Sequence, residues 1–246
     1  MARGKLIVME GLDGSGKATQ TGLLCQYLES RGRRVRHIEF PDYREPSSAL
    51  VKMYLNKEFG SNPGDVNAYA ASSFYAVDRY ASFLRFWRKD YLSGATIVAD
   101  RYTTSNAVYQ MEKTPREDWN KYLAWLQDYE YGKLQLPRPD LVLFLDMPTE
   151  ISQRLLSGRY AGDERKKDLH ESNVEFFNPM PPDRPLRGGG DGMAYGVLLS
   201  GGSAAEDRGY SKRYPGNRFP EAVTGVCRWK LFEICLKNRN KAFFDK

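Results

Sequence analysis

The feature that most constrains this chain is a glycine-rich segment near its start. Residues 11–19 read GLDGSGKAT, directly after the apolar run KLIVME and directly before a stretch in which apolar residues recur at helical spacing. Glycines between a strand and a helix let successive backbone N–H groups curl around a phosphate, and a lysine at the helix start reaches its oxygens. The segment therefore predicts a phosphate-binding loop (P-loop) with Lys17 as its lysine.

The predicted ligand of this loop is ATP with Mg²⁺. The expected ATP contacts are Gly11, Leu12, Asp13, Gly14, Ser15, Gly16, Lys17, Ala18 and Thr19. Such loops place Ser or Thr after the lysine to touch Mg²⁺, whereas this chain has Ala18. Either Thr19, Asp100 and water hold the ion, which suits a metal that keeps several waters, or metal binding is weaker than usual.

Strand and helix patterns alternate along the first part of the chain. Apolar runs typical of strands lie at 5–10, 33–40, 95–100 and 140–146, with helical patterns between them. Apolar strands separated by helices predict an α/β fold with a doubly wound parallel sheet and helices on both faces, the P-loop NTPase fold. Ligands in such folds bind beyond the carboxyl ends of the strands, so the loops that follow them should hold the chemistry.

Asp100 and Arg101 stand at the end of the third predicted strand. An aspartate there can organise a metal-bound water and the attacking phosphate oxygen, and the arginine can bridge the donor and acceptor phosphates. With Lys17, we expect these two residues to be catalytic; the alternative is a surface ion pair. Nothing points to a GTPase, because residues 56–59 (NKEF) do not complete the Asn-Lys-x-Asp guanine signature.

Charge and hydropathy argue against nucleic acid and membrane partners. The net charge of +6 comes mostly from the end of the chain: residues 1–177 hold 25 Lys and Arg against 24 Asp and Glu, whereas residues 178–246 hold 12 against 7. Residues 1–177 are thus nearly neutral, whereas a surface that binds a nucleic-acid duplex needs clustered positive charge. No apolar run approaches the roughly 20 residues that a membrane span needs, so we expect a cytoplasmic protein.

Five motifs in order resemble those of the thymidylate kinase family, the P-loop kinases that phosphorylate dTMP. They cover residues 4 to about 176 and comprise the P-loop, Phe40-Pro41, YAVDR at 75–79, DRYTTSNAVYQ at 100–110, and DLVLFLDMP at 140–148. The resemblance implies transfer of the γ-phosphoryl group of Mg·ATP to dTMP, by a protein that is usually a homodimer. Two alternatives stay open: a kinase for another deoxynucleotide, and a catalytically silent nucleotide-binding pseudo-kinase.

The resemblance also implies which residues bind dTMP. Phe40 and Pro41 are among them. Tyr75 stands where the family usually stacks a Phe on thymine, Arg79 would bond the carbonyl edge of the pyrimidine, and Asn106 would read the base. Tyr109 would lie against the sugar and disfavour a 2′-hydroxyl, and Asp13 would take the 3′-hydroxyl. The alternative for both tyrosines is core packing.

Two further arginine-bearing segments are candidates for phosphate binding. Arg44 follows the second predicted strand and could grip the acceptor phosphate, although relatives often place that arginine nearer the Phe-Pro pair. Residues 154–168 are basic and follow the fourth strand, where the family carries a lid; there we expect Arg154 and Arg159 to contact ATP. The alternative for this run is a solvated basic face.

The pattern changes at about residue 177. We expect a P-loop kinase domain at 1–177 and an irregular or disordered Gly/Pro/Arg-rich tail at 178–246, with no readable sheet. The codons of residues 192–195 (GMAY), read one base later, are compatible with Gly-Trp-His, and a Gly-Trp pair before a strand is common in relatives. The tail is therefore either a frameshift product or a lineage-specific disordered segment.

Overall fold

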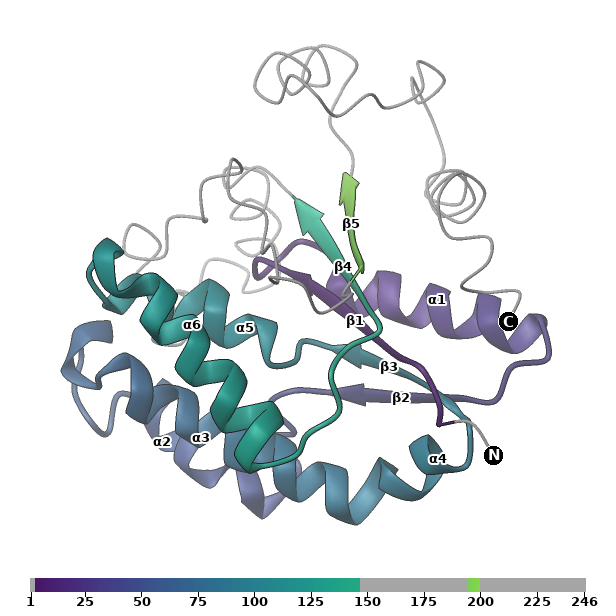
Figure 1. The fold of residues 1–246 in the computed structure, drawn as a ribbon, viewed down its shortest axis with the longest axis horizontal. Coiled ribbons are helices and arrows are strands. Elements are labelled where there is room, and N and C mark those ends of the chain that lie inside the picture. Colours follow the sequence, from purple (N-terminus) through teal and green to yellow (C-terminus); the bar gives the residue numbers. More distant parts are fainter. Residues whose placement is uncertain (1–2, 147–193, 200–246) are drawn as a thin grey trace, which may run out of the picture.

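The computed structural model describes residues 3–146 and 194–199, without the side chains of residues 146 and 194–199. Within these residues, five parallel strands form one sheet in the order β2-β3-β1-β4-β5, as labelled in Figure 1. The strands are β1 (Leu6–Gly11), β2 (Val35–Glu39), β3 (Thr96–Asp100), β4 (Leu141–Asp146) and β5 (Ala194–Leu199). The predicted α/β fold with a parallel sheet is confirmed.

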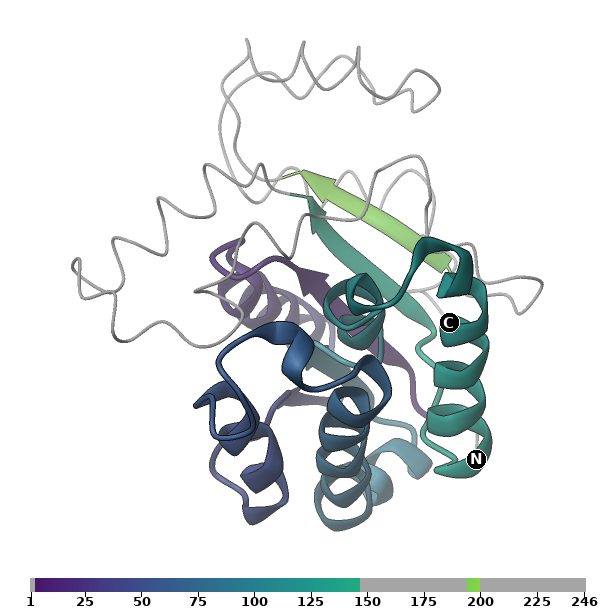
Figure 2. The same cartoon turned by 90° about the vertical axis from the view of Figure 1, so that its left-hand side faces the viewer.

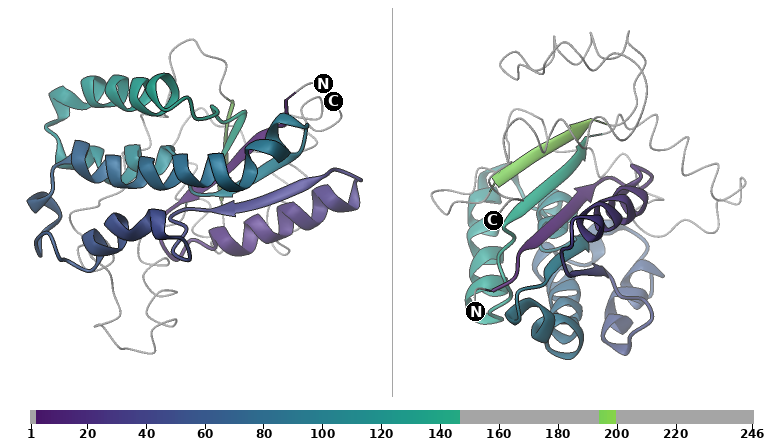
Figure 3. Two further views of the ribbon diagram at one scale, coloured as in Figure 1. Left: turned by 90° about the horizontal axis from the view of Figure 1, so that it is seen from below. Right: turned by 90° about the vertical axis from the view of Figure 1, so that its right-hand side faces the viewer.

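Helices cover both faces of the sheet. They are α1 (Lys17–Ser30), α2 (Ala49–Leu55), α3 (Ala68–Ser82), α4 (Arg88–Leu92), α5 (Thr104–Tyr109) and α6 (Trp119–Gln127), with π-helical segments at Phe83–Trp87 and Asp128–Lys133. In Figures 2 and 3, α1 lies on one side of the strands, and α3 to α6 lie on the other. No helix in the described ranges is long and apolar enough to cross a membrane.

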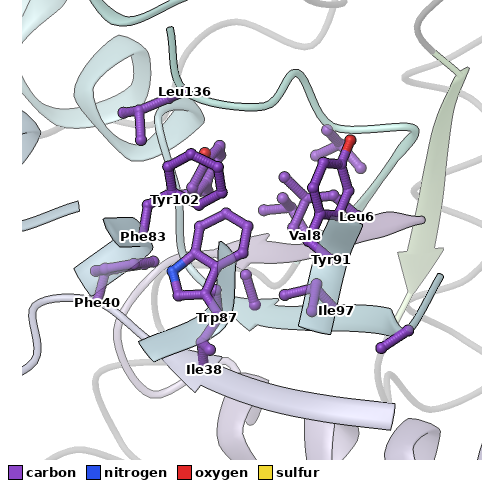
Figure 4. Close-up of a cluster of buried hydrophobic side chains, with 13 residues drawn as sticks. Leu6, Val8, Ile38, Phe40, Phe83, Trp87, Tyr91, Ile97, Tyr102 and Leu136 are labelled. Carbon is purple, nitrogen blue, oxygen red and sulfur yellow. The ribbon is translucent and has the colours of Figure 1, made fainter. Parts of the chain in front are cut away.

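The alternation of side chains along β1 explains why both faces must be covered. Ile7 and Met9 join a buried cluster with Leu24 and Leu28 of α1. Leu6 and Val8 face the other way, into a cluster that includes Trp87, Tyr91 and Tyr102 (Figure 4). Because successive residues of a strand point to opposite faces, a strand with four consecutive apolar residues, as at 6–9, needs a helix layer on each side.

Strand β5 corrects one expectation. Residues 194–199 lie within the segment that we expected to hold no sheet, yet they pair with β4 from Leu141 to Asp146. The run AYGVLL is short and apolar, as a buried strand can be, but Gly196 and the glycine-rich flanks hid it, since glycine weakens a strand pattern. The rest of the tail and the predicted lid, with Arg154 and Arg159, lie outside the described residues.

The strand order places the loops after β1 and β3 side by side. β1 and β3 are hydrogen-bonded neighbours, with Met9 opposite Asp100. The chain leaves β1 for β2 on one side and leaves β3 for β4 on the other, so these two loops flank the point where the winding changes direction. Ligands of open α/β sheets bind at such a point.

Candidate active site

The P-loop joins β1 to α1 with a backbone that glycine permits. Gly14 and Gly16 have φ of 78° and 84°, in the left-handed region, and Gly16 is the N-cap of α1. A Cβ at Gly11 would lie 2.8 Å from the carbonyl oxygen of Leu145 on β4, so a side chain there would push the strands apart. Because Gly16 offers no side-chain cap, the N–H groups that open α1 can bind an anion.

Lys17 is buried at the mouth of this loop. Its Nζ donates to the carbonyl oxygen of Leu12 at 2.7 Å and lies 3.8 Å from Oδ1 of Asp13. Burial, reinforced by the positive charge of Arg101, lowers the pKa of Lys17 to about 8. A bound phosphate would raise the pKa of Lys17 again and keep its ammonium group protonated.

Arg101 connects β3 with the P-loop. Its backbone φ of 64° is unusual for a residue with a side chain. Its guanidinium donates to Asp13 (Nη2–Oδ1, 2.6 Å), to Glu10 (Nη1–Oε1, 3.3 Å) and to the hydroxyl of Tyr109 (Nη2–Oη, 3.0 Å). Burial alone would lower the pKa of Arg101, but the Asp13 carboxylate and its other partners hold it well above the ordinary value.

Glu10 is a site residue that the sequence reading missed. It is fully buried and accepts hydrogen bonds from the hydroxyls of Thr104 and Ser105, each at 2.8 Å, in addition to Arg101. An acidic residue inside an otherwise apolar strand was the available signal, because a buried charge requires partners. Glu10 fixes the direction of the Arg101 guanidinium.

Asp100 ends β3 beside these groups. Burial raises the pKa of its carboxyl, although Lys17 and Arg101 act in the opposite direction. No residue in the described ranges donates a hydrogen bond to that carboxylate, in contrast to Glu10 and Asp13. Asp100 is therefore available to a ligand.

A cleft that opens to solvent lies next to Arg101. Its lining consists of Asp13, Phe40, Pro41, Tyr43, Leu55, Tyr75, Arg79, Arg101, Tyr102, Ser105, Asn106, Tyr109 and Gln110. Seven of these are residues that the sequence predicted to bind the acceptor nucleotide: Asp13, Phe40, Pro41, Tyr75, Arg79, Asn106 and Tyr109. The fold thus brings together side chains from the P-loop, α3, α5 and the end of β2.

The two predicted aromatic contacts sit differently in this cleft. Tyr75 is half-buried and packs edge-on against Tyr54, so it serves core packing and lines the cleft at once. Tyr109 is buried beneath the Arg101 guanidinium, whose central carbon lies 4.9 Å from the ring centroid. Burial raises the pKa of Tyr109, so its hydroxyl keeps its proton.

Arg79 and Asn106 meet at a buried carboxylate that the sequence did not predict. Arg79 is 1% exposed and forms a two-pronged ion pair with Glu130, at 2.8 Å from Nε and 2.5 Å from Nη2. Asn106 donates to the same Glu130 from Nδ2 at 3.0 Å. Glu130 outweighs the effect of burial and keeps the pKa of Arg79 raised.

Gln110 is a second missed residue of the cleft. Its side chain is 1% exposed, and its Oε1 is buried without a hydrogen-bond partner in the described part of the chain. A buried unpaired carbonyl is costly, and a polar ligand in the cleft would remove that cost. Gln110 directly follows Tyr109 in the predicted motif, which was the available signal.

Arg44 is not brought into the cleft. Its side chain is 77% exposed and pairs with Glu39 and Asp42, while the neighbouring Tyr43 lines the cleft instead. A role for Arg44 in gripping the acceptor phosphate would need a different side-chain position. Sequence proximity to the Phe-Pro pair could not show this direction.

Comparison with known proteins decides the family. The family model described as thymidylate kinase matches residues 9–180. The chain belongs to the thymidylate kinase family. It is 32% identical to the human thymidylate kinase over 186 residues, which cover 75% of this chain and 80% of that protein.

Thymidylate kinases of two other organisms give the same result. The thymidylate kinase of Schizosaccharomyces pombe is 31% identical over 205 residues, covering 83% of this chain and 88% of that protein. The solved structure of Candida albicans thymidylate kinase superposes with a TM-score of 0.56 at 26% identity, over 82% of this chain and 87% of that one. The Candida enzyme is described as having broad substrate specificity.

The metal that this family's chemistry implies has one clear ligand candidate here. The described residues contain no group of three or more His, Cys, Asp or Glu side chains that could hold an ion by themselves. Asp100 offers a carboxylate that has no donor partner among the described residues, and Thr19 is exposed on the first turn of α1. This set suits Mg²⁺, which takes most of its ligands from phosphate and water.

Proposed function

We propose that this chain transfers the γ-phosphoryl group of ATP to the phosphate of dTMP, giving ADP and dTDP. One observation carries the proposal: the P-loop and the cleft with Arg79 and Asn106 meet at Arg101, which bonds Asp13 on the P-loop side and Tyr109 on the cleft side. A donor bound at the loop and an acceptor bound in the cleft would thus present their phosphates to the same guanidinium.

The division of roles follows from the charges. Lys17 and Arg101 would stabilise the negative charge that spreads over the transferring group, since preorganised cations act strongly where water is excluded. Mg²⁺, held through Asp100 and water with Thr19 nearby, would neutralise phosphate charge when bound. Asp13 and Tyr109 would bond the sugar of the acceptor, and Arg79, Asn106 and Gln110, which line the same cleft, would bond its base.

A nucleotide panel tests this function. ATP with Mg²⁺ is offered together with dTMP, dUMP, dCMP or dGMP, and nucleoside diphosphate formation is followed. We expect dTMP to be the preferred acceptor. A clear preference for another nucleotide would favour the alternative kinase, and binding of dTMP without turnover would favour the pseudo-kinase.

We also propose that the chain forms a homodimer through α3. Val77, Tyr80 and Leu84 are 45%, 37% and 45% exposed, and their spacing of three and four residues puts them on one stripe of the α3 helix and its π-helical continuation. A contiguous apolar stripe on an exposed helix is typical of a protein interface. A second copy of the chain is the occupant that agrees with the family's usual assembly. The cytoplasmic location stays a prediction.

A further inference from the structure

One buried carboxylate supports the wall of the cleft that faces the acceptor base. Glu130 is fully buried and lies in the π-helical segment Asp128–Lys133, outside all the motifs that carry the family resemblance. Its Oε1 accepts from both Nη2 of Arg79 and Nδ2 of Asn106, and its Oε2 accepts from Nε of Arg79. The two candidate base-reading residues, Arg79 and Asn106, are thus held in position by Glu130, which does not itself line the cleft.

The partners of Asn106 allow its amide only one orientation. Nδ2 donates to Glu130 at 3.0 Å and to the backbone carbonyl of Ser72 at 3.2 Å. Both neighbours only accept, so the reversed amide would set its oxygen against two oxygens in a buried place. The amide oxygen of Asn106 accepts no hydrogen bond from the described residues. Because Asn106 lines the cleft, this oxygen is available to accept a hydrogen bond from a ligand.

Arg79 provides the opposite character on the same wall. A guanidinium only donates, and two of its nitrogens are held by Glu130 while Nη1 reaches the carbonyl oxygen of Tyr102 at 3.4 Å. The wall thus offers one fixed acceptor, on Asn106, beside the N–H groups of Arg79. Thymine and uracil carry an N3–H donor next to the O4 acceptor, whereas cytosine carries an N3 acceptor next to an amino group.

We infer that Glu130 is a positioning residue that sets the hydrogen-bond polarity of Asn106 and Arg79, and thereby selects thymine and uracil over cytosine. The inference rests on the proposed function of the same cleft. Without the carboxylate, only the backbone carbonyl of Ser72 still holds the orientation of the Asn106 amide, and Arg79 is left as an uncompensated buried charge. Both changes would weaken recognition of the acceptor base and leave the P-loop as it is.

Glu130→Gln tests the inference, because the change keeps the volume and removes the charge. We expect the KM for dTMP to rise by about tenfold or more while the KM for ATP stays within about twofold. The ratio of kcat/KM for dTMP to that for dCMP should fall by about tenfold or more, since a turned amide no longer rejects cytosine. A general loss of packing would lower both activities together and leave this ratio unchanged.

Tyr122→Phe is the matched control. The change removes another buried hydrogen-bonding group next to Asn106 and leaves Glu130 untouched. This group is the Tyr122 hydroxyl, which lies 2.6 Å from Ser72 Oγ and donates to the backbone carbonyl of Asn106 at 3.2 Å. We expect a lower melting temperature and a dTMP-to-dCMP ratio within about twofold of the wild type. If this control shifts the ratio as much as Glu130→Gln does, the inference is wrong.

Glu130→Asp covers the case in which the glutamine variant does not fold. It keeps the buried charge, but its shorter side chain cannot bond Arg79 and Asn106 together, so we expect the ratio to fall by about threefold or more. A folded Glu130 variant with a wild-type ratio would overturn the inference. A wild-type enzyme that does not phosphorylate dTMP would instead overturn the proposed function.

Discussion

The guanidinium of Arg101 lies 2.6 Å from the carboxylate of Asp13, so the end of β3 is tied to the P-loop by a partly buried, charge-assisted hydrogen bond. Such a bond is short and about twice as strong as a neutral one. The hydroxyl of Tyr109 also contacts Asp13, at 3.3 Å. The three side chains form one unit between the two halves of the site.

Removing the Tyr109 hydroxyl should loosen this unit and keep the aromatic ring. In Tyr109→Phe we expect kcat/KM for dTMP to fall by about tenfold, because the hydroxyl bonds two charged groups. The discrimination against a ribonucleotide acceptor should persist, since the ring stays in place. Steady-state kinetics with the deoxy and ribo forms of one acceptor check both points, and an unchanged kcat/KM would remove the hydroxyl from the mechanism.

Asp100→Asn should separate binding from turnover. The change removes charge but little volume, and the carboxylate has no donor partner in the described part of the fold that would be lost. We expect kcat to fall by about 100-fold or more, with the melting temperature and ATP affinity nearly unchanged. Single-turnover kinetics and calorimetric titration with ATP measure the two effects, and wild-type turnover would exclude Asp100 from the chemistry.

The lowered pKa of Lys17 predicts proton uptake on ATP binding. In the free protein the lysine loses its proton above about pH 8, whereas a bound phosphate favours the charged form and raises its pKa. ATP affinity should therefore fall as the pH rises above about 8, by up to about tenfold per pH unit.

Calorimetry at pH 8.5, in two buffers with different ionisation enthalpies, detects that uptake. Lys17→Arg is the control, because its charge does not titrate in this range and its ATP affinity should not depend on pH. Equal binding heats in both buffers for the wild type would contradict the prediction.

The apolar stripe on α3 predicts that one charge disrupts the proposed dimer. Leu84→Glu should yield a monomer in light-scattering measurements, because a desolvated carboxylate in an interface is costly. Phe59→Glu changes a similarly exposed apolar residue in the loop after α2 and should leave the assembly as it is. A dimeric Leu84→Glu protein would show that the interface lies elsewhere.

The origin of the tail can be decided at the level of the gene. We predict that restoring the shifted reading frame from about residue 177 gives a more stable and more active kinase than the chain as written, because an additional helix packed on the sheet would contribute to the roughly 5–15 kcal/mol of net stability of a domain. Melting temperatures and dTDP formation of the two proteins are compared. Equal values, or an early stop codon in the shifted frame, would refute the frameshift account.

The parts of the fold and site that local sequence patterns encode could be predicted. A helix follows the P-loop as expected, at Lys17–Ser30, and Lys17, Asp100 and Arg101 meet because strand ends gather at one edge of a parallel sheet. Glu130 lies 51 positions from Arg79, and no spacing rule links such residues before the fold is known. The position of the Arg44 side chain could not be predicted either, since closeness in sequence to the cleft does not set the direction of a side chain.

The charges around the P-loop do not cancel. Within the described residues, Lys17 and Arg101 face three carboxylates, those of Glu10, Asp13 and Asp100. When all five groups are charged and before any nucleotide arrives, this neighbourhood has an excess of one negative charge, and two phosphate esters would add several more. ATP should therefore enter as a complex with a divalent cation, and its free anion should bind far more weakly, most of all at low ionic strength, where repulsion is least screened.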